Sequence, residues 1–265
     1  MNISNRSITS FLLLSLLSTG LLSCALATGN SSPAAQTSVA TPPVVPFHTP
    51  KPDPGFHLLF NGLSTENWRL STVKNQHGAN PGRFIVVRGM LEAIAGNSLG
   101  LYWCTTPTPA DFILKLDWMT SRISDNSGIF IRFPDPEKQG YANTAQAGID
   151  DGFEVQIDQR GRPDGAAKHK TGAIYNFAGP EHADALPLHP PGQWNQFEIR
   201  VQGQTYSISL NGQPITLFHF NVGSNQQHPE RGLPSSASVP RFIGLQTHPG
   251  SSPIYFRNIQ IKQNT

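Results

Sequence analysis

Apolar and polar side chains alternate along much of the chain after about residue 55. In the sequence FEVQID at residues 153–158, Phe153, Val155 and Ile157 would lie on one face of an extended segment and three polar residues on the other. A period of two residues indicates a β-strand with one buried face. Similar runs predict strands at residues 56–60, 84–93, 111–120, 128–133, 152–158, 171–177, 195–215, 241–248 and 253–262. No segment of the sequence has convincing helical spacing.

Two dipeptides predict tight turns between these strands. Arg88-Gly89 interrupts the run at 84–93, and Asn211-Gly212 interrupts the run at 195–215. Asn-Gly is the strongest short hairpin signal, because a two-residue primed turn requires positive φ at both positions. Many antiparallel strands with one apolar face each predict two sheets packed face to face. We therefore predict an all-β fold, an antiparallel β-sandwich of jelly-roll type.

The first 23 residues have the pattern of a signal peptide. A single basic residue, Arg6, precedes an apolar run at 11–22, which is shorter than the ~20 residues needed to span a membrane. The run ends in LLSC, which resembles the lipobox of bacterial lipoproteins, in which the cysteine, here Cys24, becomes the acylated first residue. We expect a lipid-anchored protein of the bacterial cell envelope. Cleavage at a later small residue would instead give a secreted protein.

Residues 24–54 are rich in Pro, Ser, Thr and Ala and carry almost no charge. Such a composition cannot form a core and predicts an extended tether. The folded domain is therefore expected to span residues 55–265.

Composition and charge agree with this organisation. The 265 residues include 24 Gly and 23 Pro, and only 14% are charged, which suits a turn-rich β protein. The net charge of +2 falls to +1 without Arg6, which is too little for binding nucleic acid. Of the two cysteines, Cys24 and Cys104, the second is expected to be a buried core residue, so no internal disulfide is predicted. Nothing in the sequence predicts a protein partner.

Six segments in order carry a resemblance to a known family. They are GFHLLFNGLSTENW, NSGIFIRF, GFEVQID, TGAIYNF, PGQWNQFEIRVQGQTYSISLNGQPI and IGLQTHPGSSPIYFRNIQIK. From about residue 55 to 262, the chain resembles the bacterial 3-keto-disaccharide hydrolase domain family. The resemblance implies a concanavalin A-like lectin/glucanase sandwich, commonly secreted, that acts on sugars. In such a sandwich, the outward face of one curved sheet forms a groove for a carbohydrate.

The resemblance also implies which residues would act in that groove. Cleavage of a 3-keto-glycoside requires a base that removes the C2 proton, a group that stabilises the enolate, and an acid for the leaving oxygen. Glu154, Arg132 and His248 are predicted to fill these roles in that order, or Glu154 and His248 exchange theirs. The residues predicted to bind substrate are Gln156, Asp158, Tyr175 and Gln246.

Several alternatives stay open at this point. Glu154-Val-Gln156-Ile-Asp158 is similar to the Glu-x-Asp-x-Glu strand of laminarinase-like retaining glucanases, although Asp is too short to reach back as Glu can. A groove of amides and aromatic residues also suits a lectin-like module without catalysis. No cofactor is predicted, but a divalent metal held by histidine and carboxylate groups from different strands is conceivable. The polar row at 154–158 could also be a solvated strand face.

Overall fold

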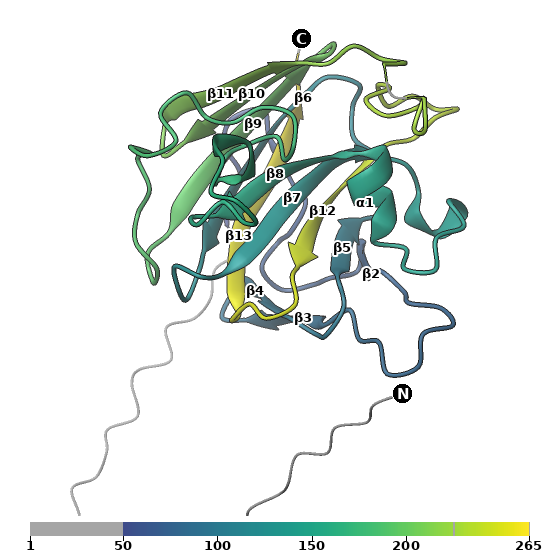
Figure 1. Cartoon of the computed structure of the whole chain (residues 1–265), viewed down its shortest axis with the longest axis horizontal. Coiled ribbons are helices and arrows are strands. Elements are labelled where there is room, and N and C mark those ends of the chain that lie inside the picture. The colour runs from purple at the N-terminus through teal and green to yellow at the C-terminus, as the bar shows by residue number, and fades with distance from the viewer. Residues whose placement is uncertain (1–49, 225, 265) are drawn as a thin grey trace, which may run out of the picture. The chain divides into compact units, whose positions relative to one another are not determined.

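The computed structural model describes residues 50–224 and 226–264, and two antiparallel sheets are the main regular structure of this part of the chain (Figure 1). The larger sheet has the order β11 (Gln213–His219), β10 (Thr205–Leu210), β9 (Asn195–Gln202), β6 (Phe112–Met119), β13 (Ile254–Gln263), β4 (Met90–Ile94) and β3 (Arg83–Val87), with β1 (His57–Leu58) paired to β13. The smaller sheet has the order β2 (Trp68–Leu70), β5 (Gly100–Cys104), β12 (Phe242–Thr247), β7 (Asn126–Phe133) and β8 (Phe153–Asp158). The predicted antiparallel β-sandwich is confirmed.

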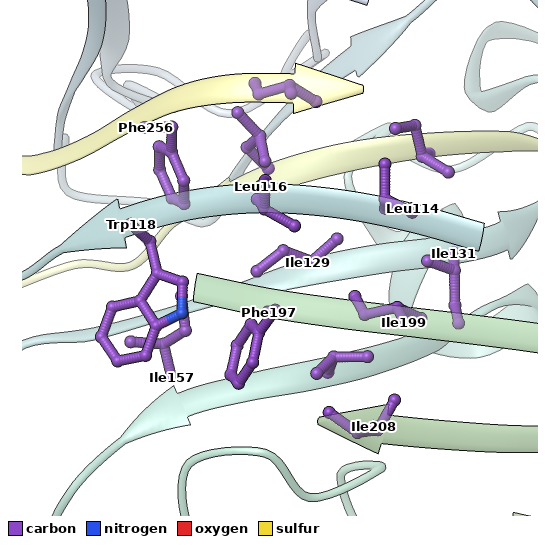
Figure 2. Close-up of a cluster of buried hydrophobic side chains, with 14 of the residues drawn as sticks. Leu114, Leu116, Trp118, Ile129, Ile131, Ile157, Phe197, Ile199, Ile208 and Phe256 are labelled. Carbon is purple, nitrogen blue, oxygen red and sulfur yellow. The ribbon is translucent and has the colours of Figure 1, made fainter. Parts of the chain in front are cut away.

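The core lies between the two sheets and contains the apolar half of each alternating strand. Phe153, Val155 and Ile157 of β8 are at most 1% exposed, as the sequence pattern predicted. Figure 2 shows side chains of β6, among them Leu116 and Trp118, in one cluster with residues of β7, β8 and β9. Burial of this apolar surface is the main favourable term in folding.

Local turn chemistry also agrees with the sequence. Arg88 and Gly89 have φ values of 48° and 79° between β3 and β4, and Asn211 and Gly212 have 49° and 80° between β10 and β11. Both pairs therefore have positive φ at two successive residues, as a primed two-residue hairpin requires. Cys104 is buried in the core, as predicted, and burial raises the pKa of its thiol.

The structure differs from the predicted elements in four places, one of which is the short strand β2, which was not predicted. The segment 171–177 is a series of turns and not a strand, because Gly172 and Asn176 have φ values of 83° and 69° and Ile174 makes only isolated bridges. Strand β5 was not predicted, because all five of its residues are buried and it shows no alternation. The helix α1 (Gln146–Asp151) was missed because six residues are too few to show a helical period. Two 3-10 turns cover Pro136–Lys138 and Ala167–His169.

The signal peptide, Cys24 and most of the tether lie outside the described residues, so these assignments stay predictions. Within the described residues, no helix is both long enough and apolar enough to cross a membrane.

Candidate functional site

The outer face of the smaller sheet has an apolar half and a polar half. The apolar half is formed by side chains of β5, β7 and β12 together with Ala145: Leu101, Trp103, Phe130, Phe133 and Phe242. Helix α1 packs against β7 here, and a Cβ atom on Gly148 would lie 2.8 Å from Cγ of Phe130. The helix thus covers the part of the apolar half around Phe130.

A cavity of about 160 Å³ lies over the polar half. It brings together five of the predicted site residues, which come from β8, β12 and the segments that follow those strands: Glu154, Gln156, Tyr175, Gln246 and His248. Leu99, Asn126 and Ile149 complete its lining. Glu154, Gln156 and Gln246 lie on one face because β8 and β12 both pair with β7 and present alternate side chains outward, and Tyr175 and His248 reach the same cavity from the segments after these strands.

Glu154 is held by amide groups from two strands. The side chain of Gln246 donates from Nε2 to Oε1 of Glu154 at 2.7 Å. With its amide oriented so that the nitrogen faces Ser127 O at 2.9 Å, Gln156 also donates to Oε1, at 3.1 Å. No described residue forms a hydrogen bond with Oε2 of Glu154. One carboxyl oxygen is therefore fixed by the sheet and the other is free to meet a ligand.

Gly128 makes room for this carboxyl group. It lies on β7 beside β8, and a Cβ atom at this position would overlap Oε1 of Glu154. Its φ is not in the left-handed region, so the requirement for glycine here is one of space. The sequence segment NSGIFIRF contained this residue, but its position under the carboxyl group follows only from strand pairing.

Burial shifts the pKa values of the two proton-transfer candidates in opposite directions. Removal from water raises the pKa of Glu154 from 4.5 to about 8, although the hydrogen bond from Gln246 opposes the shift. Burial lowers the pKa of His248 below its ordinary value. Nδ1 of His248 lies 3.0 Å from Pro249 O, so the tautomer that donates there leaves Nε2 unprotonated. At pH 7, Glu154 is then mainly protonated and His248 is neutral.

Tyr175 lies at the border of the cavity. Its main-chain N–H donates to Glu154 O at 2.9 Å, and its ring centroid is 5.0 Å from that of His169. Burial and the nearby Glu154 raise the pKa of its phenol, which therefore remains a hydrogen-bond donor at neutral pH.

Two further acceptor atoms in the cavity have no partner. Oδ1 of Asn126 and Oε1 of Gln246 are buried and form no hydrogen bond within the described residues. An unsatisfied buried acceptor costs about 1–3 kcal/mol, so such atoms suit a ligand that brings hydroxyl or amino donors. Asn126 was not among the predicted site residues, because nothing in its local sequence distinguishes it from other strand-end asparagines.

A second cavity, of about 130 Å³, adjoins the first. Both cavities are lined by Ile149, Glu154 and Tyr175, so Glu154 lies where they meet. The second cavity is completed by Gly152, Phe153, Asn176, Phe177 and Arg231.

Arg132 does not belong to this site, and the prediction that it shares the groove face is wrong. It has a φ of 56° at a β-bulge, where Ile243 pairs with Ile131 and Phe242 with Phe133. The bulge breaks the alternation of β7 and turns Arg132 into the protein. Its fully buried guanidinium donates to main-chain oxygens at 2.6–3.1 Å: Ala110 O, Gly203 O and Gly232 O.

Asp158 shares the outward face of β8 but lines neither cavity. Its carboxylate accepts from the main-chain N–H groups of Arg160 at 2.8 Å and Arg162 at 3.2 Å, and from Nε of Arg162 at 2.9 Å. Asp158 therefore ends β8 with its carboxylate bound to the turn that follows the strand, and it does not join the predicted substrate-binding residues at the cavity.

The rest of the described structure offers no comparable polar site. A larger cavity of about 310 Å³ lies near β1, Cys104 and the end of β13, but its lining is mainly apolar and contains no carboxylate. Among residues 50–224 and 226–264, no cluster of three or more His, Cys, Asp or Glu side chains is arranged to hold a metal ion. The polar cavity at Glu154 is therefore the candidate active site.

Comparisons with known proteins agree with the β-sandwich fold described above. A family model described as 3-keto-alpha-glucoside-1,2-lyase-like domain matches residues 55–262. No curated protein matches the chain. A candidate glycosyl hydrolase from Parabacteroides distasonis ATCC 8503, solved as a crystal structure, is 25% identical with a TM-score of 0.56, covering 79% of this chain and 99% of that one.

Two other solved structures are alike at the level of the fold. A second candidate glycosyl hydrolase from the same organism is 20% identical, with a TM-score of 0.59 over 80% of this chain and 95% of that one. A Bacillus subtilis protein of unknown function with a galectin-like fold is 14% identical, with a TM-score of 0.51 over 75% of this chain and 90% of that one. The predicted concanavalin A-like sandwich is consistent with these folds.

Proposed function

Because the chain belongs to the 3-keto-alpha-glucoside-1,2-lyase-like domain family, we propose that it is an enzyme that cleaves 3-keto-glycosides. One observation carries the proposal. A carboxyl group with one fixed and one free oxygen, Glu154, lines the same cavity as His248, and burial gives the two groups the opposite protonation states that acid–base catalysis requires.

The chemistry follows from the ketone at C3, which acidifies the hydrogen on C2. A base takes this proton, and the C2–H electron pair forms an enolate with C3. The enolate then re-forms the ketone, a C1–C2 double bond forms, and the C1–O bond breaks. The leaving oxygen takes a proton from an acid. Addition of water across the C1–C2 double bond gives the free 3-keto sugar.

The protonation states support a specific division of these roles. Neutral His248, with Nε2 unprotonated, is the base at C2, and protonated Glu154 is the acid for the leaving oxygen. Of the two assignments predicted from the sequence, this is the second, in which His248 is the base and Glu154 is the acid. With Arg132 elsewhere, the phenol of Tyr175 is the donor proposed for the enolate oxygen.

The unpaired acceptors support a carbohydrate as the ligand. Oδ1 of Asn126 and Oε1 of Gln246 can accept hydrogen bonds from sugar hydroxyl groups, which replace the partners these atoms lack. A conventional retaining glucanase is less well supported, because that chemistry uses two carboxyl groups about 5–5.5 Å apart. Glu154 is the one carboxylate among the described residues that line the two cavities, and Asp158 is occupied in its turn.

The pH dependence of kcat on a 3-keto-α-glucoside tests this proposal. Activity should fall above about pH 8, as Glu154 loses its proton, and fall again below the lowered pKa of His248, as the base becomes protonated. His248→Asn should remove the acidic limb and lower kcat by about 10²-fold or more. A lectin-like module would bind the sugar without turnover at any pH, and that result would refute the proposal.

A further inference from the structure

The second cavity contains an arginine without a carboxylate partner. Arg231 is 8% exposed and lines this cavity beside Phe177. Its Nε donates to Asp150 O at 2.7 Å, and its Nη2 donates to Ile149 O at 2.7 Å and to Asp150 O. These acceptors are neutral main-chain oxygens, and Arg231 forms no ion pair with any carboxylate of the described residues.

The surroundings of Arg231 leave one side of the guanidinium free. Its central carbon lies 5.3 Å from the ring centroid of Phe177 and 5.9 Å from that of Phe153, so aromatic faces flank it. Asp151, on the neighbouring helix α1, is occupied by Tyr141 OH and His228 Nδ1, both at 3.0 Å. Nη1 of Arg231 makes no hydrogen bond to a described residue, although it belongs to a side chain that is largely buried.

The two cavities therefore differ in charge. The first contains amide acceptors, Glu154 and His248, and no lysine or arginine lines it. Arg231 is the one strong cation among the described residues that line either cavity. The carboxylates of Asp150 and Asp151 act on Arg231 electrostatically, but neither forms an ion pair with it, and a largely buried cation that no carboxylate contacts favours binding of an anion.

We infer that Arg231 and Phe177 form a second subsite that binds a carboxylate on the leaving group of the substrate. This inference rests on the proposed function, because Glu154 lies between the cavities and would protonate the oxygen that joins the two halves of the substrate. The keto sugar occupies the first cavity, where the acceptors lie. The leaving group occupies the second cavity, where its carboxylate meets Nη1 of Arg231 and its body contacts the ring of Phe177, which is 39% exposed.

A pair of matched substrates tests the subsite. They are the 3-keto-α-glucosides of 4-hydroxybenzoate and 4-hydroxybenzamide, which have nearly the same size and differ in charge. The amide withdraws electrons more strongly, so leaving-group reactivity alone favours the neutral substrate. We expect the wild-type kcat/KM to be about 10-fold or more higher for the carboxylate, as one charge-assisted hydrogen bond provides.

Variants assign this preference to Arg231. Arg231→Gln should reduce the carboxylate-to-amide ratio of kcat/KM to about 1–2, and Arg231→Lys should keep part of the preference because it keeps the charge. The ratio of kcat/KM is measured within each variant. A general loosening of the segment that carries Arg231 lowers kcat/KM for both substrates and therefore leaves their ratio unchanged. Arg200→Gln, at an exposed arginine of β9, is the control and should leave the ratio unchanged. If Arg231→Gln does not fold, the carboxylate-to-amide ratios of the wild type and of Arg231→Lys still test the subsite. A wild-type ratio near 1 would overturn it.

A binding measurement separates this inference from the proposed function. Free 4-hydroxybenzoate and 4-hydroxybenzamide are titrated into the protein by calorimetry, with no catalysis involved, and the acid should bind at least about 10-fold more tightly. A wild-type ratio near 1 with both substrates turned over would overturn the subsite and keep the proposed function. Absence of turnover, with Arg231-dependent binding of the acid, would overturn the proposed function and keep the subsite.

Discussion

Glu154→Gln changes the ionisation of one buried side chain and little else. Glutamine has nearly the same size, and its carbonyl oxygen can keep the hydrogen bonds that Gln246 and Gln156 donate to Oε1. The amide has no proton to give or take at neutral pH. The substitution therefore tests the role of Glu154 in catalysis and the energetic cost of its burial at the same time.

The effect on stability follows from the raised pKa of Glu154. The unfolded chain loses this proton near pH 4.5, whereas the folded protein keeps it up to about pH 8. Between these values, ionisation favours unfolding, so the wild type loses stability as the pH rises and levels off above pH 8. The pKa difference corresponds to at most ~5 kcal/mol at ~1.4 kcal/mol for each pH unit. Because Glu154 is partly exposed at the cavity, we expect about 2–4 kcal/mol.

Urea unfolding of the wild type and Glu154→Gln at pH 4 and pH 8 measures this difference. The stability of the variant relative to the wild type should rise by about 2–4 kcal/mol from pH 4 to pH 8. Its kcat on a 3-keto-glycoside should fall by about 10²–10⁴-fold. Glu66→Gln, at an exposed carboxylate, is the matched control and should change neither quantity.

Two results would refute the reasoning in different ways. A stability difference that is the same at pH 4 and pH 8 would show that burial does not raise the pKa of Glu154. The stability difference between Glu154→Gln and the wild type could instead grow from pH 4 to pH 8 while the kcat of the variant stays within about threefold of the wild type. That result would show that Glu154 is buried and protonated but takes no part in the reaction.

Three further substitutions test other parts of the structure. Gly128→Ala should lower kcat at least about 10-fold, because the new Cβ displaces the carboxyl group of Glu154, while circular dichroism shows a folded protein. An unchanged kcat would contradict the close approach of residue 128 to that carboxyl group. Arg132→Met should lower the free energy of unfolding in urea by about 2–4 kcal/mol, because three main-chain oxygens lose their donor, and equal stability would contradict the interior position. Cys24→Ser should move the protein from the membrane to the soluble fraction of expressing cells, because acyl chains would provide its membrane affinity; equal distribution would contradict the proposed lipid anchor.

The amino-acid sequence by itself determined which face of the regularly alternating strands, such as β8, is buried. The alternation at Phe153, Val155 and Ile157 predicted an inward apolar face, and the structure buries all three. The turn at Asn211-Gly212 was predicted for the same reason, since its positive φ values depend on the two residues that form it. Side-chain period and turn chemistry are local properties, and they can be read along the chain without knowledge of what each strand pairs with.

Only the tertiary structure decided which of the outward side chains meet. Gln246 donates to Glu154 across 92 residues of sequence, and Gly128 lies beside the same carboxyl group because β7 separates β12 from β8. A bulge in β7 removed Arg132 from the face that its alternation predicted, and a loop between β11 and β12 supplied Arg231. Strand order, register shifts and loop paths arise from packing between segments distant in the chain, and these long-range contacts leave no periodic trace in the local sequence.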